Sequence, residues 1–154
     1  MTGPSTVDRI ESALAAVTDP EYPGISIVDM GMVGAVSFSG GHARVELVPT
    51  FTGCPALAFI EADVIEAVTA IDEVRAATVD TAPSIVWDTS RLSPTAIETM
   101  ARDLTVGVAL PSRPTPCPRC HAHALVELST FGPTRCRSIH RCRACDEIVE
   151  VLRA

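Results

Sequence analysis

The sequence predicts an α+β fold, namely a small two-layer domain with the order αββαβα followed by a small cysteine-rich module of β type. Apolar residues recur at helical spacing in three segments, and alternating segments flank a Gly-Gly pair. Five of the six cysteines lie after residue 116. The chain has 154 residues, of which 47% are hydrophobic and 20% charged, so it can bury a core and most of it is not disordered.

Each element has its own signal in chain order. The first helix is expected from Ser5, a candidate N-cap, to Thr18. Two strands of a hairpin follow, and then Pro55 suits the first turn of a long helix, because its missing N–H needs no partner there. A third strand precedes a last helix that Ser93 and Pro94 begin. The strands are expected over residues 34–38, 43–48 and 74–79, with residues 85–87 as an extension of the sheet.

Charge and cysteine content both change near residue 110. Residues 1–110 carry 5 Arg and 15 acidic residues, a net charge of −10, whereas residues 111–154 carry 7 Arg and 4 acidic residues, a net charge of +3. Three prolines between residues 111 and 116 indicate a stiff, extended linker. We therefore expect an α+β domain over residues 1–108, a linker over 109–116 and a four-cysteine domain of zinc-ribbon type over 117–154.

Two C-x-x-C pairs form the strongest chemical signal of the sequence. Two residues between thiols let both sulfurs turn to one point, and two such turns complete a tetrahedral cage. Zinc is the expected metal, with an iron-sulfur centre or disulfides as the alternatives. A short tail with few large apolar residues would draw much of its folding free energy from the bound metal. The expected ligands are Cys117, Cys120, Cys142 and Cys145.

Three further residues each allow two interpretations. Cys136 is either a small buried core residue or a competing ligand at a second functional site. Cys54 lies beside Gly53 at the predicted start of the middle helix, where unpaired N–H groups favour a thiolate, but it could equally be a buried structural cysteine. Asp29 follows a short extended segment and is either a turn former or a ligand.

Several classes of function are disfavoured. No apolar run approaches the roughly 18 residues of a membrane span, and Asp8 and Glu11 stand where a signal peptide would be basic, so a cytoplasmic protein is expected. The net charge of −7 and the absence of lysine disfavour nucleic acid, and a docking surface for an acidic protein is expected in the tail. No hydrolase triad, phosphate loop, dinucleotide fingerprint or Glu-x-x-His pair occurs, so no catalytic activity of its own is expected.

Two sequence blocks and the tail resemble known families. Residues 19–33, with Asp19-Pro20-Glu21, and residues 49–56, with Thr52-Gly53-Cys54-Pro55, resemble the MIP18 (DUF59) family of iron-sulfur assembly domains. Such a domain followed by Cys-Pro-Arg-Cys and by residues 131–145 resembles the D-subunit family of phenylacetyl-CoA 1,2-epoxidase systems.

The resemblance implies a non-catalytic accessory protein of aerobic phenylacetate degradation that helps assemble a metal centre or an iron-sulfur cluster. Its partners would be the oxygenase and reductase subunits of the epoxidase system. Zn2+ would be structural, and Cys54 would transiently bind iron or a cluster, with one Cys54 from each chain of a homodimer as one arrangement. The alternatives are a general iron-sulfur cluster maturation factor and a zinc-ribbon adaptor for protein interactions.

Overall fold

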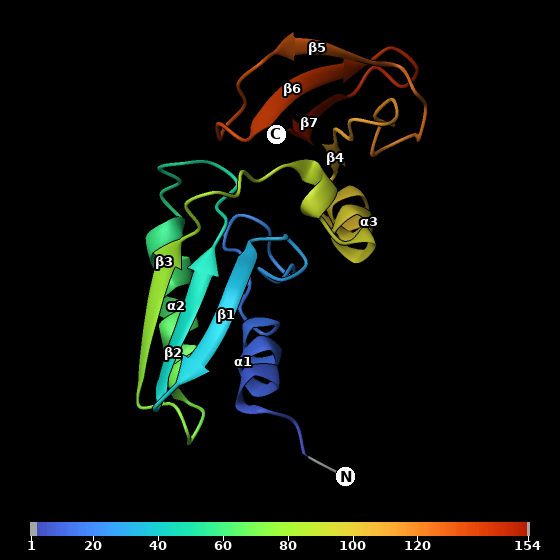
Figure 1. Cartoon of the computed structure of the whole chain (residues 1–154). Coiled ribbons are helices and arrows are strands. Elements are labelled where there is room, and N and C mark those ends of the chain that lie inside the picture. The colour runs from blue at the N-terminus through green and yellow to red at the C-terminus, as the bar shows by residue number, and fades with distance from the viewer. Residues whose placement is uncertain (1–2, 154) are drawn as a thin grey trace. The chain divides into compact units, whose positions relative to one another are not determined.

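The computed structural model describes residues 3–153 and divides into two compact units, Met1–Val86 and Trp87–Ala154. In the first unit, a helix precedes a hairpin, and a second helix connects the hairpin to a third strand (Figure 1). The elements are α1 (Thr6–Leu14), β1 (Val33–Ser39), β2 (His42–Leu47), α2 (Leu57–Thr69) and β3 (Ala76–Thr81). These elements confirm the expected α+β class and the order of the first five elements.

The sheet of the first unit has the order β1-β2-β3. Gly40 and Gly41 form the hairpin turn with φ values of +57° and +85°, so both positions favour glycine. β1 and β2 are antiparallel, whereas β2 and β3 are parallel because α2 crosses between them behind the sheet (Figure 1). Ala43, Val45 and Leu47 of β2 are fully buried, so one face of the sheet forms the core with the helices.

The first helix has the predicted start and an earlier end than predicted. Ser5 caps it in a capping box, in which the Ser5 hydroxyl accepts the Asp8 N–H and the Asp8 carboxylate accepts the Ser5 N–H. The helix ends at Leu14 instead of Thr18, because the next residues pair with another segment. Thr18 forms a β-bridge with Ser26, and the Ile27 N–H donates to the Val17 carbonyl at 2.9 Å.

The second unit contains one 3₁₀ turn, one helix and four strands. They are η1 (Thr89–Arg91), α3 (Pro94–Asp103), β4 (Val106–Val108), β5 (Leu125–Ser129), β6 (Arg137–Cys142) and β7 (Ile148–Leu152). Its sheet has the order β4-β7-β6-β5, in which β4 is parallel to β7 and the other neighbours are antiparallel. Ser93 caps α3 as predicted, since its hydroxyl accepts the Ala96 N–H at 3.0 Å.

The structure places the boundary between the compact units at residue 86, not in the proline-rich segment 109–116 expected from the sequence. The reason is β4, whose backbone pairs with β7 and thereby joins α3 and β4 to the cysteine-rich module. The pairing continues into the expected linker, where the Ala109 N–H donates to the Leu152 carbonyl at 2.9 Å. Residues 85–87 form no strand, so the predicted extension of the sheet was wrong.

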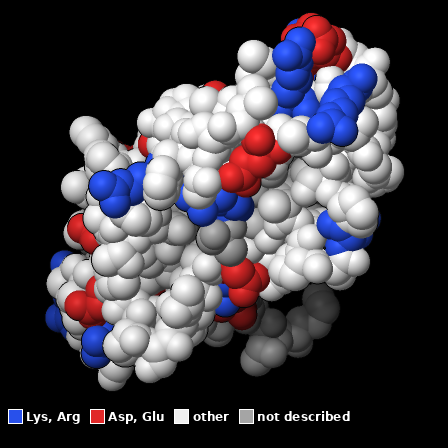
Figure 2. Space-filling view, turned by 90° about the horizontal axis from the view of Figure 1, so that it is seen from above, with Lys and Arg blue, Asp and Glu red and all other residues white. Residues whose placement is uncertain are grey.

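The surface is mixed in charge and contains no membrane span in the part described. On the face shown in Figure 2, arginines and acidic side chains lie in small groups separated by uncharged surface. Among residues 3–153, every helix is too short or too polar to cross a bilayer.

Candidate metal centre

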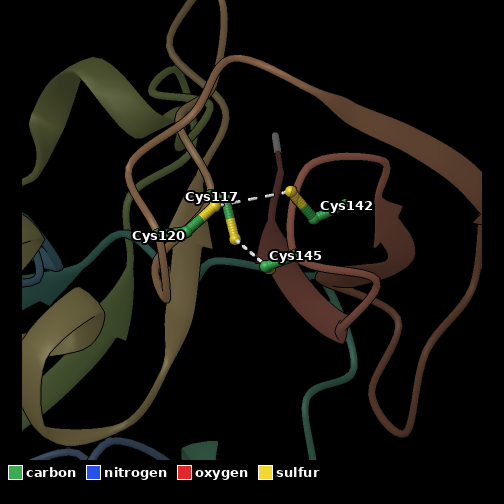
Figure 3. A group of neighbouring side chains, drawn as sticks. All are labelled: Cys117, Cys120, Cys142 and Cys145. Atoms are coloured by element: carbon green, nitrogen blue, oxygen red, sulfur yellow. Dashed lines mark hydrogen bonds between the residues drawn. The ribbon is translucent and has the colours of Figure 1, made fainter.

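The first cysteine pair lies in a tight turn after the proline-rich segment. The His121 N–H donates to the Cys117 carbonyl and the Cys117 N–H donates to the Ala122 carbonyl, both at 2.9 Å. The Arg119 N–H points at the Cys117 sulfur at 3.4 Å. These bonds close the turn, so Cys117 and Cys120 present their sulfurs on the same side (Figure 3).

The second pair repeats this hydrogen-bond pattern between β6 and β7. The Asp146 N–H donates to the Cys142 carbonyl at 2.8 Å, and the Cys142 N–H donates to the Glu147 carbonyl at 2.9 Å. The residue after the second cysteine of each pair is left-handed, with φ of +62° at His121 and +64° at Asp146. The sequence interpretation overlooked both residues, although their shared position directly after each C-x-x-C is a signal that could have identified them.

The two turns bring the four thiols together (Figure 3). The sulfurs of Cys117 and Cys145 are 3.9 Å apart, those of Cys120 and Cys142 are 3.6 Å apart, and all four lie within 4.8 Å of one another. A tetrahedral zinc with bonds of about 2.3 Å would separate its sulfurs by about 3.8 Å. The thiols therefore fit a single tetrahedral metal ion, and four protein ligands leave no open coordination position.

The thiols also have unequal affinities for a proton. The backbone N–H of Cys145 donates to the Cys142 sulfur and, together with the Ala144 N–H, lowers the pKa of Cys142 to about 7 despite burial. The Glu147 N–H lowers the pKa of Cys145, but burial and the three neighbouring thiols outweigh it and raise that pKa to about 12. Four thiolates at this separation repel one another, so a bound cation is needed to keep all of them ionised.

The surroundings of the four thiols are small and partly apolar. Cys117 and Cys142 are fully buried and pack with Val149, beside the partly buried Ala124 and Leu125. Outside this cluster, Arg141 donates two hydrogen bonds of 2.8 Å to the carboxylate of Asp146, the left-handed residue of the second turn. The ligands are thus fixed by backbone hydrogen bonds more than by packing.

Cys136 lies apart from this group. It is buried just before β6, its sulfur is 3.1 Å from the Thr134 hydroxyl, and its carbonyl accepts the Arg153 N–H at 2.9 Å. Within residues 3–153, the four clustered thiols are the only group of three or more Cys, His, Asp or Glu side chains close enough to share a metal. This position agrees with the interpretation of Cys136 as a packed core residue.

Cys54 lies in a double turn and not at the start of a helix as expected. The Cys54 N–H donates to the Phe51 carbonyl at 3.2 Å, and Gly53 has φ of +87°, which a turn of this kind requires at its third position. The Cys54 carbonyl then accepts the Leu57 N–H at 3.1 Å, and α2 begins only at Leu57. Cys54 is half-buried between the exposed Gly53 and Pro55, so its thiol is accessible in part.

Asp29 also lies in a turn of the first unit. The Ser26 hydroxyl donates to the Asp29 carboxylate and accepts the Asp29 N–H, both at 3.0 Å. The Met30 N–H donates to the Ser26 carbonyl at 2.9 Å, and Gly31 follows with φ of +68°. One carboxylate oxygen therefore has a structural hydrogen bond, as expected for a turn former.

Comparison with known proteins assigns both parts of the chain. Residues 7–80 match the family described as iron-sulfur cluster assembly protein, and residues 101–153 match the PaaD zinc beta ribbon domain. The chain belongs to the DUF59 iron-sulfur assembly family and carries a PaaD-type zinc ribbon. The match to the ribbon begins within α3, so it includes β4, in agreement with the second compact unit.

Full-length and structural relatives agree with this assignment. The DUF59 chain is 29% identical over 153 residues to the D subunit of the Escherichia coli (strain K12) system named “Putative 1,2-phenylacetyl-CoA epoxidase”, covering 94% of this chain and 90% of that one. A DUF59 domain from Bacillus anthracis is 29% identical, with a TM-score of 0.55 over 59% of this chain and 87% of that one. A conserved hypothetical protein from Thermotoga maritima is 27% identical, with a TM-score of 0.54 over 65% of this chain and 98% of that one.

Proposed function

We propose that this protein is a non-catalytic accessory subunit of a cytoplasmic phenylacetyl-CoA epoxidase system and assists assembly of a metal centre or an iron-sulfur cluster in that system. The observation that carries the proposal is the combination of a DUF59 domain and a PaaD-type zinc ribbon in one chain, shared along almost its whole length with the Escherichia coli relative. Its partners are the oxygenase and reductase subunits of the epoxidase.

The ribbon supplies structure and not chemistry in this proposal. Its metal is zinc, since four thiolates at tetrahedral spacing suit that ion and the match is to a zinc ribbon. Four protein ligands leave no position for a substrate or a water. Zn2+ bound by Cys117, Cys120, Cys142 and Cys145 therefore holds the two turns together, and any metal that is delivered to the epoxidase is carried elsewhere.

Cys54 is the proposed carrier residue. Its thiol is half-buried in a turn between the exposed Gly53 and Pro55, and it lies in the domain that matches iron-sulfur cluster assembly proteins. A single thiolate cannot hold a cluster alone, so further ligands come from the recipient or from Cys54 of a second chain in a homodimer. Asp29 is a candidate accessory ligand through the carboxylate oxygen that does not bond Ser26.

Deletion of the gene tests this function. Cells without the protein should fail to grow on phenylacetate and should grow normally on succinate, and the oxygenase or reductase purified from them should be deficient in iron. Fully metallated and active components from the deletion strain would contradict the proposal.

Replacement of Cys54 tests the carrier. Cys54→Ser should fail to restore growth of the deletion strain on phenylacetate, while its melting temperature and zinc content stay those of the wild type. The matched control is Cys136→Ser, which changes a cysteine that lies outside the thiol cluster and away from the Cys54 turn. Full growth with Cys54→Ser would leave Cys54 with a packing role only.

A general iron-sulfur maturation factor is the second candidate, favoured by the match of residues 7–80 to iron-sulfur cluster assembly proteins. It predicts that the deletion strain grows poorly on every carbon source, because many iron-sulfur enzymes would be affected. A zinc-ribbon adaptor, by contrast, predicts growth that depends on the ribbon and not on Cys54.

A further inference from the structure

Helix α2 exposes an apolar face that nothing in the first unit covers. Its inner residues Ile60, Val64 and Val68 are at most 1% exposed and form part of the core. On the outside, Phe59 is 69% exposed and Ile65 is 39% exposed. Helical spacing places them in one outer stripe with the exposed alanines of the helix, Ala58 and Ala62. An exposed phenylalanine amid small residues is a feature of interaction surfaces.

Acidic side chains border this stripe. Asp63 and Glu66 follow Phe59 at intervals of four and seven residues, so they continue the same line along the helix. Both line a groove of about 370 Å³ between α2 and the end of α1. The other lining residues are Val17, Thr18 and the alanines at positions 16, 67 and 70, so no basic side chain is among those described.

The groove therefore attracts a positive charge. Besides the two carboxylates, the carbonyl groups at the end of α1 carry the partial negative charge of a helix C-terminus, and the last turn of α1 has no basic residue. Residues 1–86 as a whole carry 3 Arg and 12 acidic residues, a net charge of −9. Lysine and arginine side chains of a partner are complementary to this surface.

We propose that the outer face of α2, formed by Ala58, Phe59, Ala62, Asp63, Ile65 and Glu66, docks a subunit of the epoxidase through a contact surface that combines apolar side chains with arginine or lysine. This inference rests on the proposed function for the identity of the partner. A second copy of the chain is disfavoured as the occupant, because a symmetric contact would bring Asp63 and Glu66 of both copies together.

The position of the face gives it a role in delivery. Phe59 lies in the first turn of α2, and the Cys54 turn leads directly into that helix. A partner that binds around Phe59 is therefore held at the end of α2 from which Cys54 is presented. Docking on this face would select the recipient, and Cys54 would act on the recipient so selected.

Binding measurements with purified epoxidase components test the proposal. The full chain is immobilised, and each oxygenase and reductase component is passed over it at low and at moderate ionic strength. We expect Phe59→Ser to weaken binding about tenfold or more, as for a central aromatic contact. Glu66→Arg should slow association several-fold, most strongly at low salt. The control Glu11→Arg makes the same charge change on an exposed residue of α1 that does not line the groove.

The outcomes separate this proposal from the proposed function. Weaker binding by Phe59→Ser and Glu66→Arg, with Glu11→Arg like the wild type and all three folded by circular dichroism, would support the docking face. Equal binding by all variants would overturn the docking face and leave the function standing. No binding of any component by the wild type would overturn both. A dimer in light scattering that Phe59→Ser dissociates would identify a second copy as the occupant and overturn the proposal.

Discussion

The two compact units are stabilised in different ways. In the first, helices and a sheet enclose large apolar side chains, among which Ile10, Leu14, Leu47 and Ile60 are at most 1% exposed. In the second, the apolar cluster beside the thiols contains only Val149 and two cysteines as buried members among the residues described. The first unit thus has a core that needs no metal, whereas the cysteine-rich part of the second depends on one.

Their charges differ as well. The first unit carries −9, whereas residues 87–154 carry 9 Arg and 7 acidic residues, a net charge of +2 before any metal is bound. Four thiolates and one Zn2+ would bring this to about zero. Charge therefore equips the first unit, more than the ribbon, to recognise a basic partner. The single Tyr22 and the single Trp87, both buried, report on the first and second units respectively.

The largest expected effect is loss of the metal. Cys142→Ser removes a buried ligand, and the structural metal of comparable small domains contributes on the order of 10 kcal/mol to folding. The variant should lose its zinc in elemental analysis and the native fluorescence of Trp87, while the ring resonances of Tyr22 stay native. Cys136→Ser is the control and should keep one zinc. Native Trp87 fluorescence in metal-free protein would contradict the comparison.

Truncation within the first unit should have the opposite pattern. Leu47→Ala leaves a cavity in a fully buried part of β2 and should lower the stability of the first unit by about 2–5 kcal/mol. Denaturation followed at Tyr22 should shift to lower urea, while zinc content stays at one per chain. Concerted loss of zinc with the Tyr22 transition would mean that the two units do not unfold independently.

A smaller effect is expected at the left-handed residues of the ribbon. His121 has φ of +62°, a conformation that costs a side chain roughly 1 kcal/mol and glycine almost nothing. His121→Gly should therefore stabilise the zinc-bound second unit by up to about 1 kcal/mol in the transition of Trp87. Asp146→Gly should gain less, because it also removes the pair with Arg141. A clear loss of stability in His121→Gly would indicate a ligand-like role for the imidazole.

The smallest expected effect concerns the cap of α1. Hydrogen bonds from the side chain and the backbone of Ser5 lower the pKa of Asp8. Because the native pKa lies below the unfolded value of about 3.9, the cap stabilises the first unit above that pH and is lost as the pH falls through the native pKa. Asp8→Ala should lower the Tyr22 denaturation midpoint at neutral pH, and the difference should shrink in acid. A difference that does not depend on pH would exclude the carboxylate as its cause.

Local sequence signals were sufficient for part of the fold and of the site. Ser5 and Ser93 cap helices as predicted, because an N-cap depends only on a hydroxyl and the next few N–H groups. The Gly40-Gly41 turn joins the predicted hairpin. The spacing within each C-x-x-C pair likewise restricts where two sulfurs can point, and the structure groups the four predicted thiols.

Other features had no sufficient local signal. β4 is three residues long with Gly107 at its centre, and only its pairing with β7 makes it a strand. β6 begins with alternating polar residues, and its register comes from its position between β5 and β7. The Cys54 turn was predicted as the start of a helix, because Pro55 fits a first helical turn as well as it fits the second position of a turn.

The sequence by itself determined the chemistry of this protein: four paired thiols for a metal, one thiol after a glycine in the other domain, and the family to which these blocks belong. The tertiary structure decided the boundary of the second unit, the separation of Cys136 from the metal ligands and the exposure of Phe59. The physical reason is range. Thiol spacing, caps and turns depend on neighbours in the chain, whereas strand pairing and burial depend on residues far apart in the sequence.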